Sequence, residues 1–183
     1  MSDLSPSPTV LFQSERLIFR PFTSDDFDDL KALHQHPDVA TSTFTGFSDD
    51  ARVQVELDEY IDEYERLGMS QLHVSESATG RFVGRMGFQH RQWNPELPEK
   101  EFELRFAIHP DFWRQGYATE GSKAVIAYAF EEMKLSKIVM AHFVENIKSK
   151  LIAQKLGFEK THEFTVKNRR IIGYKRMNPN ILL

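Results

Sequence analysis

Residues 101–121, EFELRFAIHPDFWRQGYATEG, combine the signals of a strand, a short loop and the start of a helix. Apolar side chains recur at every second position from Phe102 to Ile108, as in a strand with one buried face. His109-Pro110 ends this strand, because proline cannot donate a hydrogen bond to a neighbouring strand. Apolar residues then recur at helical spacing from Val125 to Met133. The loop between them contains Gly116 and opens the helix, so its N–H groups lie at the positive end of the helix dipole, where phosphate can bind.

The rest of the chain predicts further strands and helices around this segment. Alternating apolar residues indicate strands, and spacings of three and four indicate helices that end at glycine or proline. Strands are expected at residues 15–22, 71–76, 81–90, 137–143, 158–166 and 170–176, and helices at 23–35, 48–67 and 146–156. The strand, helix and strand between Phe102 and Phe143 require a parallel, right-handed crossover, whereas most other strands can form hairpins. The sequence therefore predicts an α+β fold with a mixed sheet.

The composition excludes several classes of function. A chain of 183 residues is typical of one domain with a sizeable core. Its net charge of -4 argues against a nucleic-acid-binding surface. It contains no cysteine, which excludes disulfides, thiolate metal sites and a cysteine nucleophile.

The ends of the chain and its apolar segments predict where the protein works. No apolar run is long enough to cross a membrane, and the N-terminus lacks the basic and apolar regions of a signal peptide. We therefore expect a cytoplasmic protein without a membrane partner. Residues 1–10 are expected to form a flexible N-terminal tail, residues 11–178 the domain and residues 179–183 a C-terminal tail.

The segment from Trp113 to Glu120 carries a resemblance to a known family. It resembles motif A of the GCN5-related N-acetyltransferases (GNAT), whose core is Gln/Arg-x-x-Gly-x-Gly/Ala, with Gly116 and Ala118 at the small positions. The run is more similar to the Trp-Gly-x-Gly-Tyr-Ala-Thr-Glu form of the ribosomal-protein N-terminal acetyltransferases (RimJ/RimL-like), although Arg114 replaces the usual glycine.

The resemblance extends over residues 15–176. Residues 145–158, ENIKSKLIAQKLGF, look like the family's Glu-Asn-x-x-Ser segment followed by Lys-Leu-Gly-Phe. The resemblance implies a single GNAT-like α+β domain. The expected sheet is mixed and mostly antiparallel, with a splayed central pair of parallel strands and helices on both faces.

The resemblance also implies acetyl-coenzyme A as the donor, with coenzyme A as the product. The turn from Arg114 to Thr119 would hold the pyrophosphate, and the strand backbone from Phe106 to Ile108 would pair with the pantetheine arm. The implied cofactor-binding residues are Phe106, Ala107, Ile108, Arg114, Gln115, Gly116, Tyr117, Ala118, Thr119, Asn146 and Ser149.

Three residues are candidates for catalysis. Glu103 occupies a position that the family often uses as a general base acting through water, and the alternative is a surface glutamate paired with Arg105. Asn146 and Ser149 would lie near the thioester, although Asn146 also suits a helix cap. The tyrosine that many relatives use as an acid is replaced by Ala153.

Other readings of these residues are weaker. Gly116-x-Ala118-x-x-Gly121 is a degenerate dinucleotide fingerprint, but residues 109–115 separate it from the preceding strand. A Walker A motif is absent from the sequence. The seven histidines are scattered and predict no metal site.

We therefore expect an N-acetyltransferase that moves an acetyl group directly to a primary amine in a ternary complex. The acceptor would be a small-molecule amine or a protein N-terminus, and the protein a monomer or a homodimer. The alternative is a non-catalytic module that binds acetyl-coenzyme A. Specificity is expected from residues 41–47, 91–100 and 161–170, with Lys167 to Arg170 suited to an acidic acceptor. Trp93 is expected either in the acceptor cleft or as an exposed tryptophan of its loop.

Overall fold

The computed structural model describes residues 9–43, 46–92, 94–95 and 97–181. One sheet of eight strands runs through the described residues in the order β1-β2-β3-β4-β5-β6-β8-β7. All neighbouring strands are antiparallel except the central pair, β5 and β6. The strands are β1 (Phe12–Gln13), β2 (Leu17–Pro21), β3 (Gln71–Glu76), β4 (Phe82–Arg91), β5 (Glu101–Ile108), β6 (Lys137–Phe143), β7 (Glu159–Val166) and β8 (Arg169–Met177).

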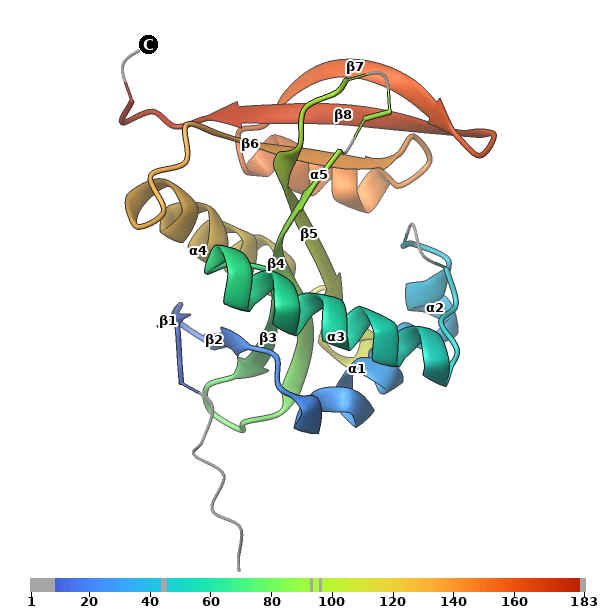
Figure 1. The fold of residues 1–183 in the computed structure, drawn as a ribbon, viewed down its shortest axis with the longest axis vertical. Helices are drawn as coiled ribbons and strands as arrows, with labels where there is room; N and C mark the ends of the chain where they lie inside the picture. Colours follow the sequence, from blue (N-terminus) through green and yellow to red (C-terminus); the bar gives the residue numbers. More distant parts are fainter. Residues whose placement is uncertain (1–8, 44–45, 93, 96, 182–183) are drawn as a thin grey trace, which may run out of the picture.

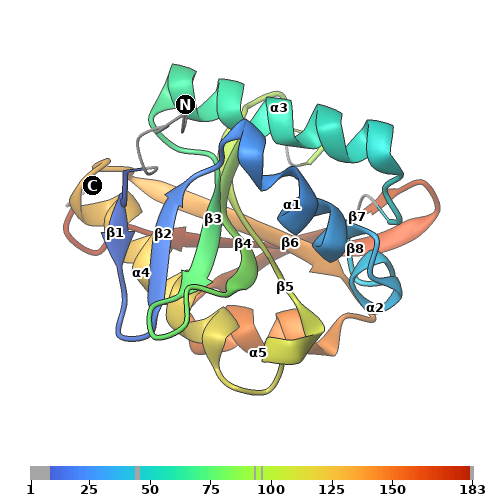
Figure 2. The ribbon, with the colours of Figure 1, turned by 90° about the horizontal axis from the view of Figure 1, so that it is seen from below.

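Helices cover both faces of the sheet (Figure 2). One face carries α1 (Phe27–His34), α2 (Pro37–Ala40) and α3 (Asp50–Leu67). The other face carries α4 (Tyr117–Glu131) and α5 (Ile147–Lys155). Single 3-10 turns precede α1 (Ser24–Asp26) and α4 (Pro110–Phe112).

The parallel pair divides the sheet into two parts. Within the described residues, the ladder between β5 and β6 has one register pair, Glu103↔Val139. β5 nevertheless stays paired with β4 as far as Ile108, and β6 stays paired with β8 as far as Phe143. The strands therefore separate toward their carboxyl ends, and β6, β8 and β7 form the upper part of the molecule in Figure 1.

The alternation along β5 sorts its side chains between two cores. Leu104 and Ile108 are buried in the main core beneath α4, with Phe102 and Phe106 packed beside them. Ala107 points to the other face and packs against α1 and α2. This is the pattern expected from the period of two along a strand.

The predicted fold class is confirmed, with additional short elements. All seven expected strands are present, and their ends differ from the expected ones by a few residues. Two short elements were not expected from the sequence: the two-residue strand β1, and the helix α2, which starts at Pro37 between the expected helices at 23–35 and 48–67. Neither element is long enough to show a periodic apolar pattern.

Within the described residues, none of the helices has the length and apolar character needed to span a membrane. The first eight residues of the expected N-terminal tail, and residues 182–183 of the expected C-terminal tail, lie outside the described residues. The amide of Leu11 donates to the Phe19 carbonyl over 2.8 Å, so the chain is paired with β2 from this residue onward.

Candidate active site

The loop before α4 presents a row of unused backbone donors. From Arg114 to Ala118, no N–H group donates to another residue in the described part of the chain. Gly116 is the residue before the helix and has a φ of 85°, a left-handed conformation that glycine adopts without strain. No side chain caps this helix. The loop therefore offers several N–H groups and the positive end of the α4 dipole to an anion.

Arg16 holds this loop from the side. Its Nη2 donates to the carbonyl of Gln115 over 3.1 Å, and its Nε donates to Glu120 over 2.7 Å. Its guanidinium also stacks on the ring of Tyr117 at 4.3 Å. Burial would raise the pKa of Glu120, but hydrogen bonds from Ser14 and Arg16 outweigh it and lower that pKa. These contacts occupy carbonyl and carboxylate groups and leave the loop N–H groups available.

Arg114 occupies the position at which the sequence departs from the motif. It is exposed and has a φ of 61°, in the left-handed region that favours glycine. This conformation explains why a glycine suits the position. The side chain does not crowd the interior of the loop, because it is exposed to solvent.

A small pocket of ≈ 50 Å³ lies where β5 and β6 separate. Its walls come from both separating strands, from α5 and from the segment after α2. The lining residues are Ser42, Thr43, Arg85, Leu104, Arg105, Phe106, Met140, Ala141 and Ser149. Two residues expected at the cofactor, Phe106 and Ser149, are thus brought together with Ser42 and Thr43 of the expected specificity segment. Arg85, Met140 and Ala141 of the same pocket were not expected from the sequence.

Glu103 is buried rather than at the surface. Its side chain is 1% exposed, and Arg91 Nε lies 3.3 Å from Oε2. That contact lacks hydrogen-bond geometry, so Oε2 is a buried oxygen without a hydrogen-bond partner in the described structure. Burial raises the pKa of Glu103, with Arg105 and Arg91 opposing the shift. A carboxyl group with a raised pKa is a stronger base than an exposed glutamate.

Asn146 and Ser149 lie at the start of α5. The Asn146 side chain accepts a hydrogen bond from the Ser149 N–H over 3.0 Å, so Asn146 caps the helix as its residue type predicts. The cap orients the first turn of α5, which carries Ser149 into the pocket wall. Ala153 is fully buried in the main core and offers no acid at the position of the family's tyrosine.

Comparison with known proteins agrees with this geometry. The family model described as "Acetyltransferase (GNAT) domain" matches residues 16–159. The chain belongs to the GNAT acetyltransferase family. This GNAT acetyltransferase is 24% identical over 155 residues to the "Uncharacterized N-acetyltransferase YoaA" of Bacillus subtilis, which covers 82% of this chain and 83% of that protein.

Solved structures of GNAT acetyltransferases have the same fold. The ribosomal-protein-S5-alanine acetyltransferase from Vibrio fischeri superposes with a TM-score of 0.73 at 15% identity, covering 92% of this chain and 97% of that one. Spermidine N-acetyltransferase from Vibrio cholerae, solved with CoA and spermine, superposes with a TM-score of 0.69 at 15% identity, covering 88% and 95%. The mostly antiparallel sheet excludes the dinucleotide-binding alternative, which needs repeated parallel strands.

The sequence analysis missed a buried polar network next to the pocket of this GNAT acetyltransferase. Glu56, on α3, lies 2.6 Å from His34 Nδ1, and His34 Nε2 accepts from Arg85 Nε over 2.8 Å. Arg85 Nη1 donates to Gln71 over 2.7 Å. The four residues come from four elements and are at most 3% exposed. A charged residue on a helical apolar face, such as Glu56 three positions after Val53, was the available signal.

Only some of the residues expected to set specificity lie at the pocket. Ser42 and Thr43 line the pocket, and Phe44, Thr45 and Trp93 lie outside the described residues. Arg169 forms an ion pair with Glu145, and Arg170 forms one with Glu163. Arg169 and Arg170, at the start of β8, are therefore already paired with carboxylates at the surface.

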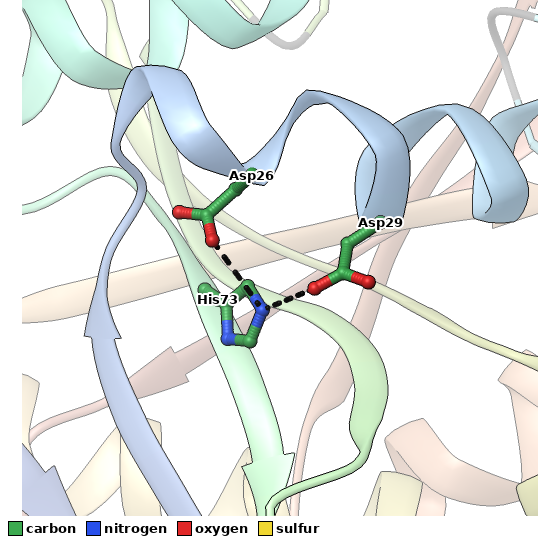
Figure 3. A group of neighbouring side chains, drawn as sticks. All are labelled: Asp26, Asp29 and His73. Carbon is green, nitrogen blue, oxygen red and sulfur yellow. Dashed lines mark hydrogen bonds and ion pairs between the residues drawn. The ribbon is translucent and has the colours of Figure 1, made fainter.

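One potential metal-binding group was not expected. Asp26, Asp29 and His73 bring three ligand atoms within 4.8 Å of one another (Figure 3). Both oxygens of Asp26, however, accept hydrogen bonds from Arg20, over 2.7 and 2.6 Å, and His73 Nε2 lies 3.0 Å from Asp29. The arginine neutralises the carboxylate that a cation would need, so the group ties α1 and its preceding turn to β3.

Proposed function

We propose that this GNAT acetyltransferase moves an acetyl group from acetyl-coenzyme A to a primary amine. The transfer is direct, within a ternary complex of enzyme, donor and acceptor. The amine nitrogen attacks the thioester carbonyl carbon, the carbon–sulfur bond breaks, and the coenzyme A thiolate leaves. The acceptor is a small-molecule amine or a protein N-terminus.

One observation carries the proposal: β5 and β6 separate beyond Glu103↔Val139 beside a loop of unused N–H donors. The β5 edge from Phe106 to Ile108 has no ladder with β6 in the described structure, so an extended amide chain can pair with it. The loop from Arg114 to Thr119 suits the pyrophosphate of the same molecule. A long ligand with amides in the middle and phosphates at one end satisfies both features.

Glu103 is the proposed general base and acts through water. Its raised pKa brings the carboxylate closer to the pKa of the amine, which eases removal of the proton. Ser149 lines the pocket, which supports a role for its hydroxyl as a donor to the thioester oxygen or to the departing sulfur. Asn146 positions Ser149 through the helix cap.

The similar proteins support acetyl-coenzyme A as the donor, but they do not indicate one acceptor amine. The Vibrio cholerae spermidine N-acetyltransferase was solved with CoA, and the Vibrio fischeri protein is named for a ribosomal protein. Their names indicate different amines on one fold, so the fold does not determine the acceptor of this chain.

Calorimetry of acetyl-coenzyme A binding tests the donor site. We expect the wild type to bind and Gly116→Val to lose at least about tenfold in affinity, because a β-branched residue is strained at a φ of 85° and the loop N–H groups would move. Gly80→Val is the matched control. Gly80 has a φ of 72° in the β3–β4 turn, and a Cβ there meets nothing within 4 Å. The control should keep wild-type affinity, and loss of binding in both variants would contradict the loop assignment.

A second candidate is a module that binds acetyl-coenzyme A without transferring the acetyl group. It is favoured by Ala153, which stands where many relatives have an acid. Incubation with radiolabelled acetyl-coenzyme A and a panel of primary amines separates the two functions. Tight binding without a labelled product from any amine would favour the module.

A further inference from the structure

The far wall of the pocket is formed by arginine side chains. Arg85 comes from β4 and Arg105 from β5, and both line the pocket. Arg85 is 2% exposed, so its charge is almost completely removed from water. A buried arginine requires polar partners around its five N–H groups.

The partners of Arg85 leave one side of its guanidinium available. Nε donates to His34 over 2.8 Å and Nη1 to Gln71 over 2.7 Å. No described residue accepts a hydrogen bond from Nη2, and no described carboxylate forms an ion pair with Arg85. The pocket is the place where an acceptor for these donors can enter.

The hydrogen bonds fix the proton on His34. Because Arg85 can only donate, His34 Nε2 must carry a lone pair, and the single proton of a neutral ring is then on Nδ1. Nδ1 donates that proton to Glu56 over 2.6 Å. Burial lowers the pKa of His34, and Arg85 lowers it further, which agrees with a neutral ring.

The buried network of Glu56, His34 and Arg85 consequently has a negative end at Glu56 and a positive end at Arg85. The negative charge of Glu56 lies on α3, where Arg52 also binds it over 3.0 Å, and neutral His34 separates it from Arg85. The positive end faces the pocket, which Arg105 also lines, although Arg105 Nη1 already donates to Gln89. The available N–H groups of the Arg85 guanidinium beside this small pocket favour an anion there.

We propose that this pocket binds a carboxylate of the acceptor, so that the preferred acceptors are primary amines that also carry a carboxylate group. The inference rests on the proposed function and specifies its acceptor. Arg85 receives the carboxylate through its free N–H groups, and His34 and Glu56 position Arg85. Arginine presents paired donors in a plane, which match the two oxygens of a carboxylate.

The pocket size favours a carboxylate over a larger anion. A volume of ≈ 50 Å³ accommodates a planar three-atom group more easily than a tetrahedral phosphate with its ester. Arg169 and Arg170 are less suited to this task, because each is exposed and already paired with a glutamate.

The test compares amines that differ only in the anionic group. Glycine, β-alanine and 4-aminobutanoate vary the distance between amine and carboxylate, and each is paired with its primary amide. We expect kcat/KM to be about 10- to 100-fold higher for the best carboxylate than for its amide, since a charge-assisted pair is lost in the amide. 3-Aminopropylphosphonate tests the larger anion and should be a poorer acceptor than 4-aminobutanoate.

Variants of the pocket arginines test which residues cause the preference for a carboxylate. Arg85→Lys keeps the positive charge but loses the two coplanar N–H donors of the guanidinium. It should reduce the ratio of kcat/KM for the carboxylate to kcat/KM for its amide by about tenfold, through a higher KM for the carboxylate. Arg105→Gln should also reduce the ratio, which covers the case in which Arg85→Lys does not fold. Arg170→Gln is the matched control and should keep the wild-type ratio. Far-UV circular dichroism and the acetyl-coenzyme A affinity establish that each variant is folded.

Binding of product analogues separates this inference from the proposed function. N-Acetyl-4-aminobutanoate and its amide are titrated into the wild type in the presence and absence of coenzyme A. Tighter binding of the carboxylate supports the inference even if no amine is acetylated, whereas failure to bind coenzyme A contradicts the proposed function alone. Equal binding and equal turnover of carboxylate and amide, a preference for the phosphonate, or loss of the ratio only in Arg170→Gln would overturn the inference.

Discussion

The loop before α4 and the pocket between β5 and β6 offer binding groups of opposite kinds. The loop offers backbone N–H groups from five consecutive residues, Arg114 to Ala118, and its side chains are mostly exposed. The pocket offers side chains from several separate elements, and one of the buried ones, Arg85, is held by His34 and Gln71. The loop should therefore tolerate changes of its side chains but not of its backbone conformation. The pocket should tolerate small changes of backbone conformation but not the loss of its side chains.

The largest expected effect concerns Glu103, which is buried on β5. Glu103→Gln should lower kcat by about 100-fold or more, because a positioned general base contributes this much, while the acetyl-coenzyme A affinity stays near the wild-type value. Steady-state kinetics and calorimetry measure the two quantities. Glu101→Gln is the control, since Glu101 lies on the same strand and pairs with Lys137 over 2.6 Å. Equal losses in both variants would remove Glu103 from the mechanism.

The raised pKa of Glu103, the proposed general base, predicts a pH dependence of catalysis. The base works only when it is ionised, so kcat/KM should fall about tenfold per pH unit below that raised pKa. The inflection should disappear from the residual activity of Glu103→Gln. A profile that is flat in the wild type, or identical in the two proteins, would contradict the assignment.

The same shift has a consequence for stability. A carboxyl group whose pKa is raised on folding binds more protons in the native state than in the unfolded state. The stability of the wild type relative to Glu103→Gln should therefore be highest below the unfolded pKa of a glutamate and decrease as the pH rises through the raised native pKa. Urea unfolding at several pH values measures this difference.

A smaller effect is expected from the support of the pocket. Glu56→Gln removes the buried negative charge behind His34 and should lower the free energy of unfolding by about 2 kcal/mol. The carboxylate preference should weaken as well, because Arg85 loses its orientation. Asp58→Asn is the control on the same helix, where an exposed Asp58 accepts from Gln54 over 2.8 Å. Unfolding of Asp58→Asn should stay within about 0.5 kcal/mol of the wild type.

The smallest effect concerns the side chain of Arg114. Arg114→Gly suits the φ of 61° and should change the free energy of unfolding by less than about 1 kcal/mol, because relief of strain offsets the added freedom of the unfolded chain. The acetyl-coenzyme A affinity should fall about threefold at low salt and less at high salt, as for an exposed charge near phosphate. Lys134→Gly, with a φ of 57° at the far end of α4, should leave the affinity unchanged.

These two regions also differ in how far the sequence predicts them. The loop is local: Trp113 to Glu120 contain its glycine, its small residue and the first helical turn, so the motif is visible in one stretch. The same holds for the strands, whose apolar alternation predicts their positions. The charge of Glu56 on an apolar helix face was visible in the sequence, but its partners were not. His34 is 22 positions from Glu56 and 51 from Arg85, so the three meet only after folding.

The positions of single residues also depend on contacts that the sequence does not show. The burial of Glu103 depends on the neighbouring strands β4 and β6, whose registers the sequence does not specify. The separation of β5 from β6 is likewise a property of the sheet. Asn146 could be predicted as a cap, because its hydrogen bond to Ser149 joins residues three positions apart.

The single pairing of Glu103 with Val139 also affects how the two parts of the sheet unfold. A donor whose amides bonded to the open edge of β5 would act as an additional, removable strand between β5 and β6. Binding would then couple the unfolding of β1–β5 to that of β6, β8 and β7, which share little backbone pairing without it. Amide hydrogen exchange at Phe106 to Ile108 would slow on binding, and the protein would unfold in one cooperative step at a higher temperature.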